Sequence, residues 1–359
     1  MEFKEYKLGE IINIEDNKRK PLSALQRNAI KGDYPYYGAQ EIIDYINDYI
    51  FDGKYLLIAE DGENVRSQVK PLVKLVNGKF WLNNHAHIVT AKEGFSLEYI
   101  YYALLKYNFS AYITGTTQPK LNQLNLKKII LLCPEISYQD KIGKILSIID
   151  NKIKKNNNIN DNLLEIGIIL LNYTFKKEYN KIKLNKVIKF IKGKKPIEIS
   201  STYKTNFKKY LTIACLNGQE LNYANPTKTI LADNDLLMVM DGASSGDIYY
   251  SDKGIIGSTL AKLEIIDNLF EKGYLYFVLK KFTKLIKSKK TGSAIPHTDK
   301  VFVGNIQIPI LNTDEQQKFN KLLMKINQNR KENETLEQLR DTLLPKLMNG
   351  EIDIDKIEF

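Results

Sequence analysis

Hydrophobic residues follow two different periods along this chain, and the two periods alternate twice. Short runs such as residues 55–58 and 85–89 alternate apolar and polar positions between turn residues, which is typical of β-strands. From residue 139 to about 176 the apolar residues recur every three or four positions instead, which indicates a long helix. The same change occurs in the second half, where a long helix is expected over residues 314–347. The pattern therefore predicts a strand-rich domain followed by a long helix, twice.

Shorter helices are expected near residues 97–106 and 274–287, within the two strand-rich domains. The first long helix carries one predicted apolar stripe, made of Ile142, Ile145, Leu146, Ile149, Ile153, Ile159, Leu163, Ile166 and Leu170. At 1.5 Å per residue this helix should be roughly 50–55 Å long. Its apolar face is too narrow to be stable alone in solvent, so we expect it to pair with the other long helix.

Internal similarity supports this duplicated organisation. Four segments of the first half return in the second half in the same order: 7–12 as 183–188, 56–62 as 236–242, 114–119 as 291–296, and 139–146 as 316–323. The offset stays close to the 177 residues that separate Gln139 from Gln316. Each match is weak by itself, but four in the same order indicate a tandem duplication.

These patterns predict the fold class α/β (α+β), with two α/β domains in tandem. The two long helices should separate these domains and form an antiparallel coiled-coil spacer. The expected segments are residues 1–136 (first domain), 137–178 (first long helix), 179–311 (second domain), 312–348 (second long helix) and 349–359 (C-terminal tail).

The composition favours a polyanionic partner and an intracellular location. The 359-residue chain carries 53 Lys and Arg against 42 Asp and Glu, a net charge of +11. Its two cysteines, Cys133 and Cys215, lie far apart, so no disulfide framework is expected. The N-terminus has no apolar core of a signal peptide, and no apolar run reaches the length of a membrane span. We therefore expect a cytoplasmic protein.

Catalytic motifs are not evident in the sequence. It has no phosphate-binding loop, zinc helix, nucleophile elbow or zinc-ribbon cysteine pair. His85 and His87 could bind a metal, but no third ligand is evident, and structural hydrogen-bonded histidines are the simpler interpretation. Asp61 and Glu63 could form a metal-dependent nuclease pair, although no lysine follows at short spacing. We therefore expect a non-catalytic protein without a cofactor or metal of its own.

The remaining chemistry suits DNA binding. Residues 114–120 combine hydroxyls, an amide, a glycine and a lysine, groups that bind phosphate oxygens and adenine edges, and residues 291–297 are their copy. Arg27 and Arg66 belong to a set of only five arginines, and arginine is the commonest reader of guanine. An ordinary capped loop and solvated basic residues are the alternatives. The candidate DNA-binding residues are Arg19, Lys20, Arg27, Arg66, Thr116, Thr117, Gln118, Lys120, Lys194, Lys195, Ser244, Ser245, Ser293 and His297.

Two asparagines occupy the apolar register of the long helices. Asn156 and Asn333 are 177 residues apart, and both lie near the middle of their helices. Antiparallel helices would bring them together, and a buried polar pair can fix the register of a coiled coil. The alternative is that both are exposed in an asparagine-rich chain.

The order of segments and two motifs resemble a known family. The stretch 343–352, LLPKLMNGEI, strongly resembles the C-terminal signature of type I restriction–modification specificity subunits. Residues 81–87, WLNNHAH, are similar to a segment of their target-recognition domains. The resemblance covers essentially the whole chain. The second copy departs from it at residues 257–262, GSTLAK, where the histidines are missing.

The resemblance implies a function. Each domain would read one half of an interrupted sequence in double-stranded DNA, and the long helices would hold the two readers apart. Two modification (methyltransferase) subunits, which bind the methyl donor, and restriction subunits would be the protein partners. A DNA nuclease with an unrecognised site and a coiled-coil interaction scaffold remain the alternatives.

Overall fold

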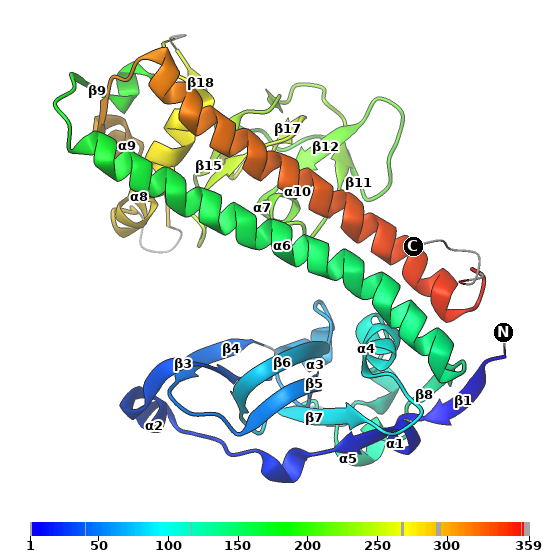
Figure 1. Ribbon diagram of the computed structural model, residues 1–359. Helices are drawn as coiled ribbons and strands as arrows, with labels where there is room; N and C mark the ends of the chain where they lie inside the picture. Colours follow the sequence, from blue (N-terminus) through cyan, green and yellow to red (C-terminus); the bar gives the residue numbers. More distant parts are fainter. Residues whose placement is uncertain are drawn as a thin grey trace. The chain divides into compact units, whose positions relative to one another are not determined.

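The computed structural model describes residues 2–39, 41–115, 117–266, 269–291, 296–352 and 354. The chain divides into two compact units, Met1–Ile153 with Thr335–Phe359, and Lys154–Glu334 (Figure 1). Each unit contains one sheet-rich domain and a segment of each long helix, α6 (Ile136–Phe175) and α10 (Thr313–Met348). The boundary between the two units therefore falls within each long helix, and the first unit combines an N-terminal and a C-terminal part of the chain.

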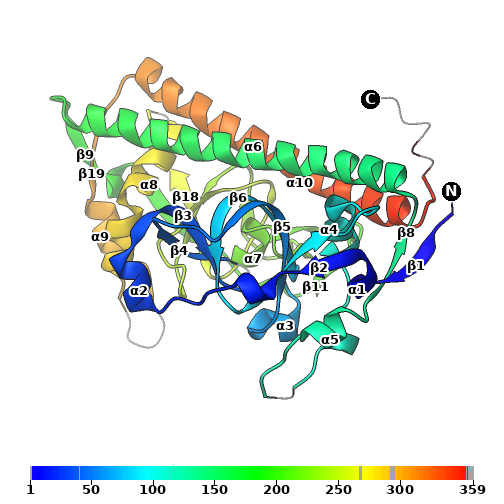
Figure 2. The same ribbon diagram turned by 60° about the horizontal axis from the view of Figure 1, so that its bottom comes forward.

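The first unit is built on a six-stranded sheet with the order β2-β7-β5-β6-β3-β4. Strands β2, β3, β4, β5 and β6 of this sheet are labelled in Figure 2. All neighbours are antiparallel except β3 and β6, which pair in parallel. The strands are β2 (Ile12–Ile14), β3 (Lys31–Tyr37), β4 (Ile42–Ile46), β5 (Phe51–Ala59), β6 (Val73–Leu82) and β7 (Ala86–Ala91). A separate antiparallel pair joins β1 (Lys4–Lys7) to β8 (Ile130–Cys133).

The short helices of the first unit are α1 (Leu8–Ile11), α2 (Ala24–Ala29), α3 (Glu63–Ser67), α4 (Leu97–Leu105) and α5 (Gln123–Leu126). Among them, α1, α3, α4 and α5 contribute buried residues to the core of the unit, whereas α2 does not. The buried face of α4 packs with β5, the start of α6 and the end of α10 in one apolar cluster. Leu344, Leu347 and Ile354 belong to this cluster, so part of the C-terminal segment contributes to the core of the first domain.

The second unit repeats the central sheet. Its four strands have the order β10-β18-β15-β16, which matches β2-β7-β5-β6. A second, five-stranded sheet has the order β11-β13-β12-β17-β14, with β12 and β17 parallel as β3 and β6 are. The strands are β9 (Lys181–Lys183), β10 (Ile188–Lys192), β11 (Ile199–Ser200), β12 (Lys208–Leu211), β13 (Tyr223–Ala224), β14 (Leu231–Ala232), β15 (Leu236–Val239), β16 (Ile248–Tyr250), β17 (Gly254–Ile256), β18 (Leu260–Ile265) and β19 (Gln307–Pro309). The helices are α7 (Ile213–Leu216), α8 (Lys272–Ser288) and α9 (Lys300–Asn305).

Equivalent contacts at the start of each long helix show the duplication directly. The buried side chain of Gln139 accepts a hydrogen bond from the backbone N–H of Ser96 (3.0 Å). Gln316, also buried, accepts one from the backbone N–H of Glu271 (2.8 Å). Two buried tyrosine hydroxyls likewise donate to the strand before each long helix, Tyr99 to Leu132 and Tyr274 to Pro309. Each long helix is thus attached to its own domain by the same polar contacts.

The two long helices run antiparallel within each unit. In the second unit Asn160 contacts Asn329, and Asn156 contacts Asn333. A lower residue number in α6 therefore pairs with a higher residue number in α10, as it does in antiparallel helices. In the first unit Arg340 of α10 binds Asp150 of α6 at 2.8 Å. The helices have 40 and 36 residues, about 60 and 54 Å at 1.5 Å per residue.

The predicted apolar stripe of the first long helix is wrong in its second half. Ile159 and Ile166 are 43% and 51% exposed, whereas Leu171 is fully buried and Gly167 faces Phe277. The helix changes its buried face because it packs on α8 as well as on α10 in the second unit. Among the described residues, no helix is both long and apolar enough to cross a membrane.

Candidate nucleic-acid interface

An Asp-Gly turn follows the same strand in both units. Asp61-Gly62 comes two residues after the end of β5, and Asp241-Gly242 comes two residues after the end of β15. The two glycines have φ values of +105° and +97°, a region that side chains with a Cβ rarely adopt. A glycine is therefore needed for the chain to turn sharply and leave each aspartate at the end of the sheet.

A closed loop lies beside each turn. Thr114 and Lys120 exchange two backbone hydrogen bonds (2.9 and 2.7 Å), and Thr291 and His297 do the same (3.0 and 2.7 Å). An isolated β-bridge joins the last residue of each loop to the aspartate of the neighbouring turn. The repeated segments of the sequence thus form one repeated structural feature, a turn paired with a loop.

In the first unit these elements surround a cleft of about 610 Å³. It brings together five of the predicted DNA-binding residues: Arg19, Arg66, Thr117, Gln118 and Lys120. Arg66 donates to the backbone carbonyl of Thr117 (3.1 Å), which ties the turn to the loop. The other lining residues are Glu60, Asp61, Gly62, Glu63, Asn84, His85 and Pro119. Three carboxylates therefore stand among the cations of the cleft.

Arg19 is a structural residue rather than a free DNA contact, which corrects the prediction. Its side chain is only 13% exposed. The guanidinium binds Glu60 (2.9 Å) and Asp16 (3.3 Å) and donates to the carbonyl of Ala86 (2.7 Å). These contacts fix the floor of the cleft and leave little of the guanidinium for a ligand.

His87 belongs to the same buried network, as the structural interpretation of the histidines predicted. Its Nε2 donates to the carbonyl of Leu121 (2.6 Å), and its Nδ1 lies 2.6 Å from Asp16. Burial raises the pKa of Asp16, but the hydrogen bonds and charge of His87 outweigh this and hold the pKa below its usual value. Asp16, Glu60 and His87 lie close enough to ligate one metal ion, but Arg19 already supplies a positive charge there.

Arg27 is also committed to the protein. It binds Asp44 (3.1 Å), donates to the carbonyl of Leu22 (2.6 Å) and lies over the ring of Tyr36 at 5.1 Å. The prediction that Arg27 reads DNA is therefore not supported, because its polar atoms already have partners inside the domain. Lys20 is exposed but does not line the cleft.

The second unit shows which hydroxyls of its loops are accessible. Ser245 is fully buried and donates to the carbonyls of Gly242 and Pro296 (2.8 Å to Pro296), so it positions the loop and cannot reach DNA in this structure. This corrects the prediction for Ser245. Ser244 is half-buried and His297 is exposed.

The remaining predicted residues are either exposed or outside the described part of the chain. Lys194 and Lys195 are exposed in the segment after β10. Thr116 and Ser293 lie outside the residues that the structure describes. The basic side chains of the second unit are therefore placed at its surface, while two of the predicted hydroxyls are not described.

Sequence reasoning missed the role of the turn aspartate. In the first unit Asp61 Oδ1 lies 2.8 Å from His85 Nδ1, and Lys120 Nζ lies 3.7 Å from its Oδ2. Half of the His85 side chain is exposed, and it lines the cleft. The signal available in the sequence is the recurrence of Asp-Gly in both halves, at residues 61–62 and 241–242.

The second unit repeats this arrangement with different partners. Asp241 Oδ1 lies 2.7 Å from His297 Nδ1, and its Oδ2 lies 2.9 Å from Lys192 Nζ. Burial raises the pKa of Asp241, but Lys192 and His297 lower it by more, so the pKa stays below its usual value. The carboxylate is therefore anionic at neutral pH.

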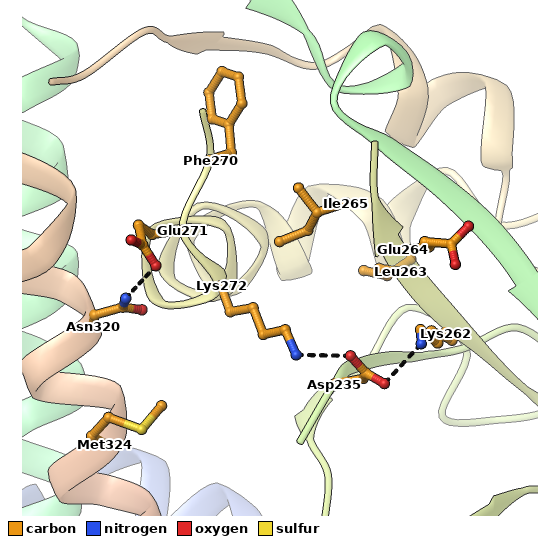
Figure 3. Close-up of a pocket in the computed structure, with 10 residues that line it drawn as sticks. All are labelled: Asp235, Lys262, Leu263, Glu264, Ile265, Phe270, Glu271, Lys272, Asn320 and Met324. Carbon is orange, nitrogen blue, oxygen red and sulfur yellow. Dashed lines mark hydrogen bonds and ion pairs between the residues drawn. The ribbon is translucent and has the colours of Figure 1, made fainter. Parts of the chain in front are cut away.

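A cavity of about 510 Å³ at the other end of β15 has a different character (Figure 3). Lys272 at the start of α8 and Lys262 on β18 both point to Asp235, at 2.8 and 2.9 Å. Glu271 turns the other way and accepts a hydrogen bond from Asn320 of α10 (2.5 Å). These charges are paired with one another and attach α8 to the sheet and to α10, which is a structural role.

Asn156 and Asn333 meet between the two long helices. Asn156 donates to Asn333 (2.9 Å), and the two residues are 1% and 7% exposed. Asn333 in turn donates to Asn157 (2.8 Å), and Asn329 donates to Asn160 (2.9 Å). The helix pair of the second unit thus contains a ladder of amides, a feature that can select one register over slipped alternatives.

Replacing both central asparagines tests this register role. The double variant Asn156→Leu/Asn333→Leu should melt at a higher temperature, because apolar residues in such positions pack without the cost of burying amides. Asn156→Leu alone should be destabilising by about 1–3 kcal/mol, because it leaves the buried amide oxygen of Asn333 without its donor. Thermal unfolding of the three chains gives the comparison; equal melting temperatures would contradict a role for the pair.

Comparisons with known proteins agree on one family. The family described as "Type I restriction modification DNA specificity domain" matches residues 1–165 and again residues 176–340. A solved structure of the type I restriction–modification S subunit of M. genitalium matches 97% of this chain and 96% of its own, with a TM-score of 0.62 and 19% identity, which shows a shared fold.

Curated relatives carry related names. A putative type I restriction enzyme specificity subunit of Haemophilus influenzae is 39% identical over 139 residues, which are 39% of this chain and 35% of the relative. The MjaVIII specificity subunit of Methanocaldococcus jannaschii is 33% identical over 149 residues, 41% and 35% of the two chains. The chain thus spans about a third of the length of these two relatives. Because the family match accounts for both halves, this chain belongs to the type I restriction–modification DNA specificity family and carries two copies of its domain.

Proposed function

We propose that the chain is the specificity subunit of a type I restriction–modification complex and reads a bipartite target in double-stranded DNA. The observation that carries the proposal is the repeated turn and loop, whose ends make the same backbone hydrogen bonds and β-bridges in both units although the side chains differ. Two recognition domains with the same architecture but different side chains are suited to two different half-sites. Antiparallel helices joined to both domains suit a fixed separation between the half-sites.

In the first unit the cleft supplies the groups for reading. Arg66, Thr117 and Gln118 are exposed and line it together. Arginine can donate to guanine O6 and N7 in a fork, and glutamine can pair with adenine N6 and N7. In the second unit the exposed Lys194 and Lys195 are suited to phosphate contacts, which give affinity without sequence preference.

The chemistry of methylation and cleavage is proposed to lie in partner subunits. Two modification subunits would bind the methyl donor, and restriction subunits would join them. The long helices offer a surface for this docking: Ile159, Ile166, Ile169 and Tyr173 are each at least 43% exposed on α6. Their spacing places them on one face of the helix. Methyl transfer by this chain alone, without a second protein, would contradict this division of labour.

Duplex binding as a function of salt tests the proposal against its alternatives. The full chain with its modification subunit should bind duplex DNA with a linear, negative slope of log K against log salt. Binding without salt dependence, or no binding, would favour an interaction scaffold. Cleavage of DNA by the purified chain with added Mg²⁺ would instead favour a nuclease.

Two substitutions separate reading from general affinity. Arg66→Ala should cost about 1–3 kcal/mol on the target and relax one position of the motif, because it removes a base contact. Lys195→Ala should weaken all sequences alike and reduce the salt slope by about 1, because it removes a phosphate contact. Titration of both variants with target and non-target duplexes measures this; equal effects of Arg66→Ala on both duplexes would exclude it as a base reader.

A further inference from the structure

Each unit places one aspartate against one lysine and one histidine, and it does so from different sequence positions. In the first unit the histidine, His85, comes from the residue before β7, and the lysine, Lys120, ends the closed loop. In the second unit the histidine, His297, ends the loop, and the lysine, Lys192, ends β10. The histidine and lysine have changed places, yet each aspartate keeps one of each. Both units thus surround the aspartate with the same two types of side chain, although these come from different sequence positions. This indicates that the combination of aspartate, lysine and histidine itself matters.

The exposures show which groups face a ligand. The side chains of Asp61 and Asp241 are 22% and 23% exposed. Those of the histidines and lysines are twice as exposed, between 48% and 51%. The histidines and lysines are therefore more accessible than the carboxylates that they contact. Contacts of 2.7–2.9 Å from Asp241 to His297 and Lys192 show that both of its oxygens have partners.

A carboxylate in this position has two effects on DNA binding. It holds the lysine and the histidine that contact it in one place, which lowers the conformational freedom of these two side chains. It also repels any phosphate that approaches the lysine and the histidine, because like charges at short range are unfavourable. Discrimination between partners often depends on such repulsive elements as well as on attractive ones.

We propose that Asp61 and Asp241 are specificity-determining residues that suppress binding of non-target DNA by competing with backbone phosphate for the neighbouring lysine and histidine, Lys120 with His85 and Lys192 with His297. This inference rests on the proposed DNA-reading function. In the target complex, base contacts made elsewhere in each unit compensate for the repulsion. On other sequences those contacts are missing, so the carboxylates keep the affinity low.

Removal of the carboxylate charge tests this role. Asp61→Asn and Asp241→Asn should tighten binding to a duplex that lacks the motif and reduce the preference for the motif. Each additional phosphate that a released cation binds should steepen the slope of log K against log salt by about 0.9. The full chain with its modification subunit is titrated with motif and motif-free duplexes of equal length at several salt concentrations.

Two controls separate this role from charge and from folding. Asp233→Asn makes the same charge change in the second unit, where Asp233 and Lys253 form an exposed pair at 3.2 Å, and it should leave the preference unchanged. Asp61→Glu and Asp241→Glu keep the carboxylate and should behave as the wild type does. A loss of preference in the glutamate variants equal to that in the asparagine variants would overturn the role of the charge.

Methylation sequencing gives a second readout that a structural role would not produce. Asp61→Asn should add methylated sites that are mismatched only in the half read by the first unit, and Asp241→Asn sites mismatched only in the other half. Weaker binding of both duplexes, or loss of methylation at the motif without new sites, would overturn the inference. If the wild-type complex itself does not prefer the motif, the proposed function fails, independently of the aspartates.

Discussion

Exchange of residues 1–136 for those of a relative with a different target should change one half of the methylated motif and leave the other half intact. The turn, the closed loop and the cleft of the first unit all lie within this segment. The equivalent loop of the second unit lies within residues 179–311. Because the described residues of the turn, of the loop ends and of the cleft all come from residues 1–136, the expected effect is a full change of one half-site.

The reciprocal exchange of residues 179–311 is the matched control and should change the other half-site. The grafted first domain must still pack on Leu344 and Leu347 of α10, which belong to its core, so the donor should keep apolar residues on α4. Methylation sequencing of both hybrids reads the outcome. A simultaneous change in both halves by either exchange would contradict two independent readers.

Gly167→Ala should strongly destabilise the second unit. A Cβ at this position would lie 2.0 Å from a ring carbon of Phe277, which is fully buried. Phe277 packs against Phe319 with ring centroids 5.8 Å apart, so the ring cannot move without disturbing the attachment of α6 and α10 to the domain. Overpacking of this kind typically costs about 1–3 kcal/mol and occasionally more.

The direction of the change in the free energy of unfolding shows whether α6 packs on Phe277. Alanine is the better helix former, so in an open helix the same change would stabilise by roughly 0.5–1 kcal/mol. Asn162→Ala, at an exposed position of the same helix, is the control and should change stability little. Urea unfolding of both variants gives the free energies; a Gly167→Ala chain more stable than the wild type would show that α6 does not pack on Phe277.

Periodicity and repetition predicted the architecture well because both are properties of the chain itself. The long helices were expected over residues 139–176 and 314–347, and the structure has them at Ile136–Phe175 and Thr313–Met348. The prediction that Ile166 belongs to the buried apolar stripe is wrong for a physical reason. In the second unit α6 packs on α8 as well as on α10, which changes its buried face, and a periodic pattern in the sequence does not contain the position of this additional partner.

The candidate site was predictable in its loops but not in its individual side chains. Arginine and serine were selected for what they can bind, yet Arg19, Arg27 and Ser245 bind the protein itself. Their partners are distant in sequence, for example Ala86 for Arg19, so only the fold shows that they are occupied. The roles of Asp61 and Asp241 were missed for the same reason, because their histidine and lysine come from different segments in the two halves.

The most direct test of two half-site readers is methylation sequencing of a host that expresses this chain with the modification subunit proposed as its partner. Parallel cultures should express each protein alone. We expect one methylated motif made of two specified parts separated by a fixed number of unspecified bases, and methylation only when both proteins are present. A continuous motif, a variable separation, or methylation that does not require this chain would contradict a pair of readers held at a fixed distance.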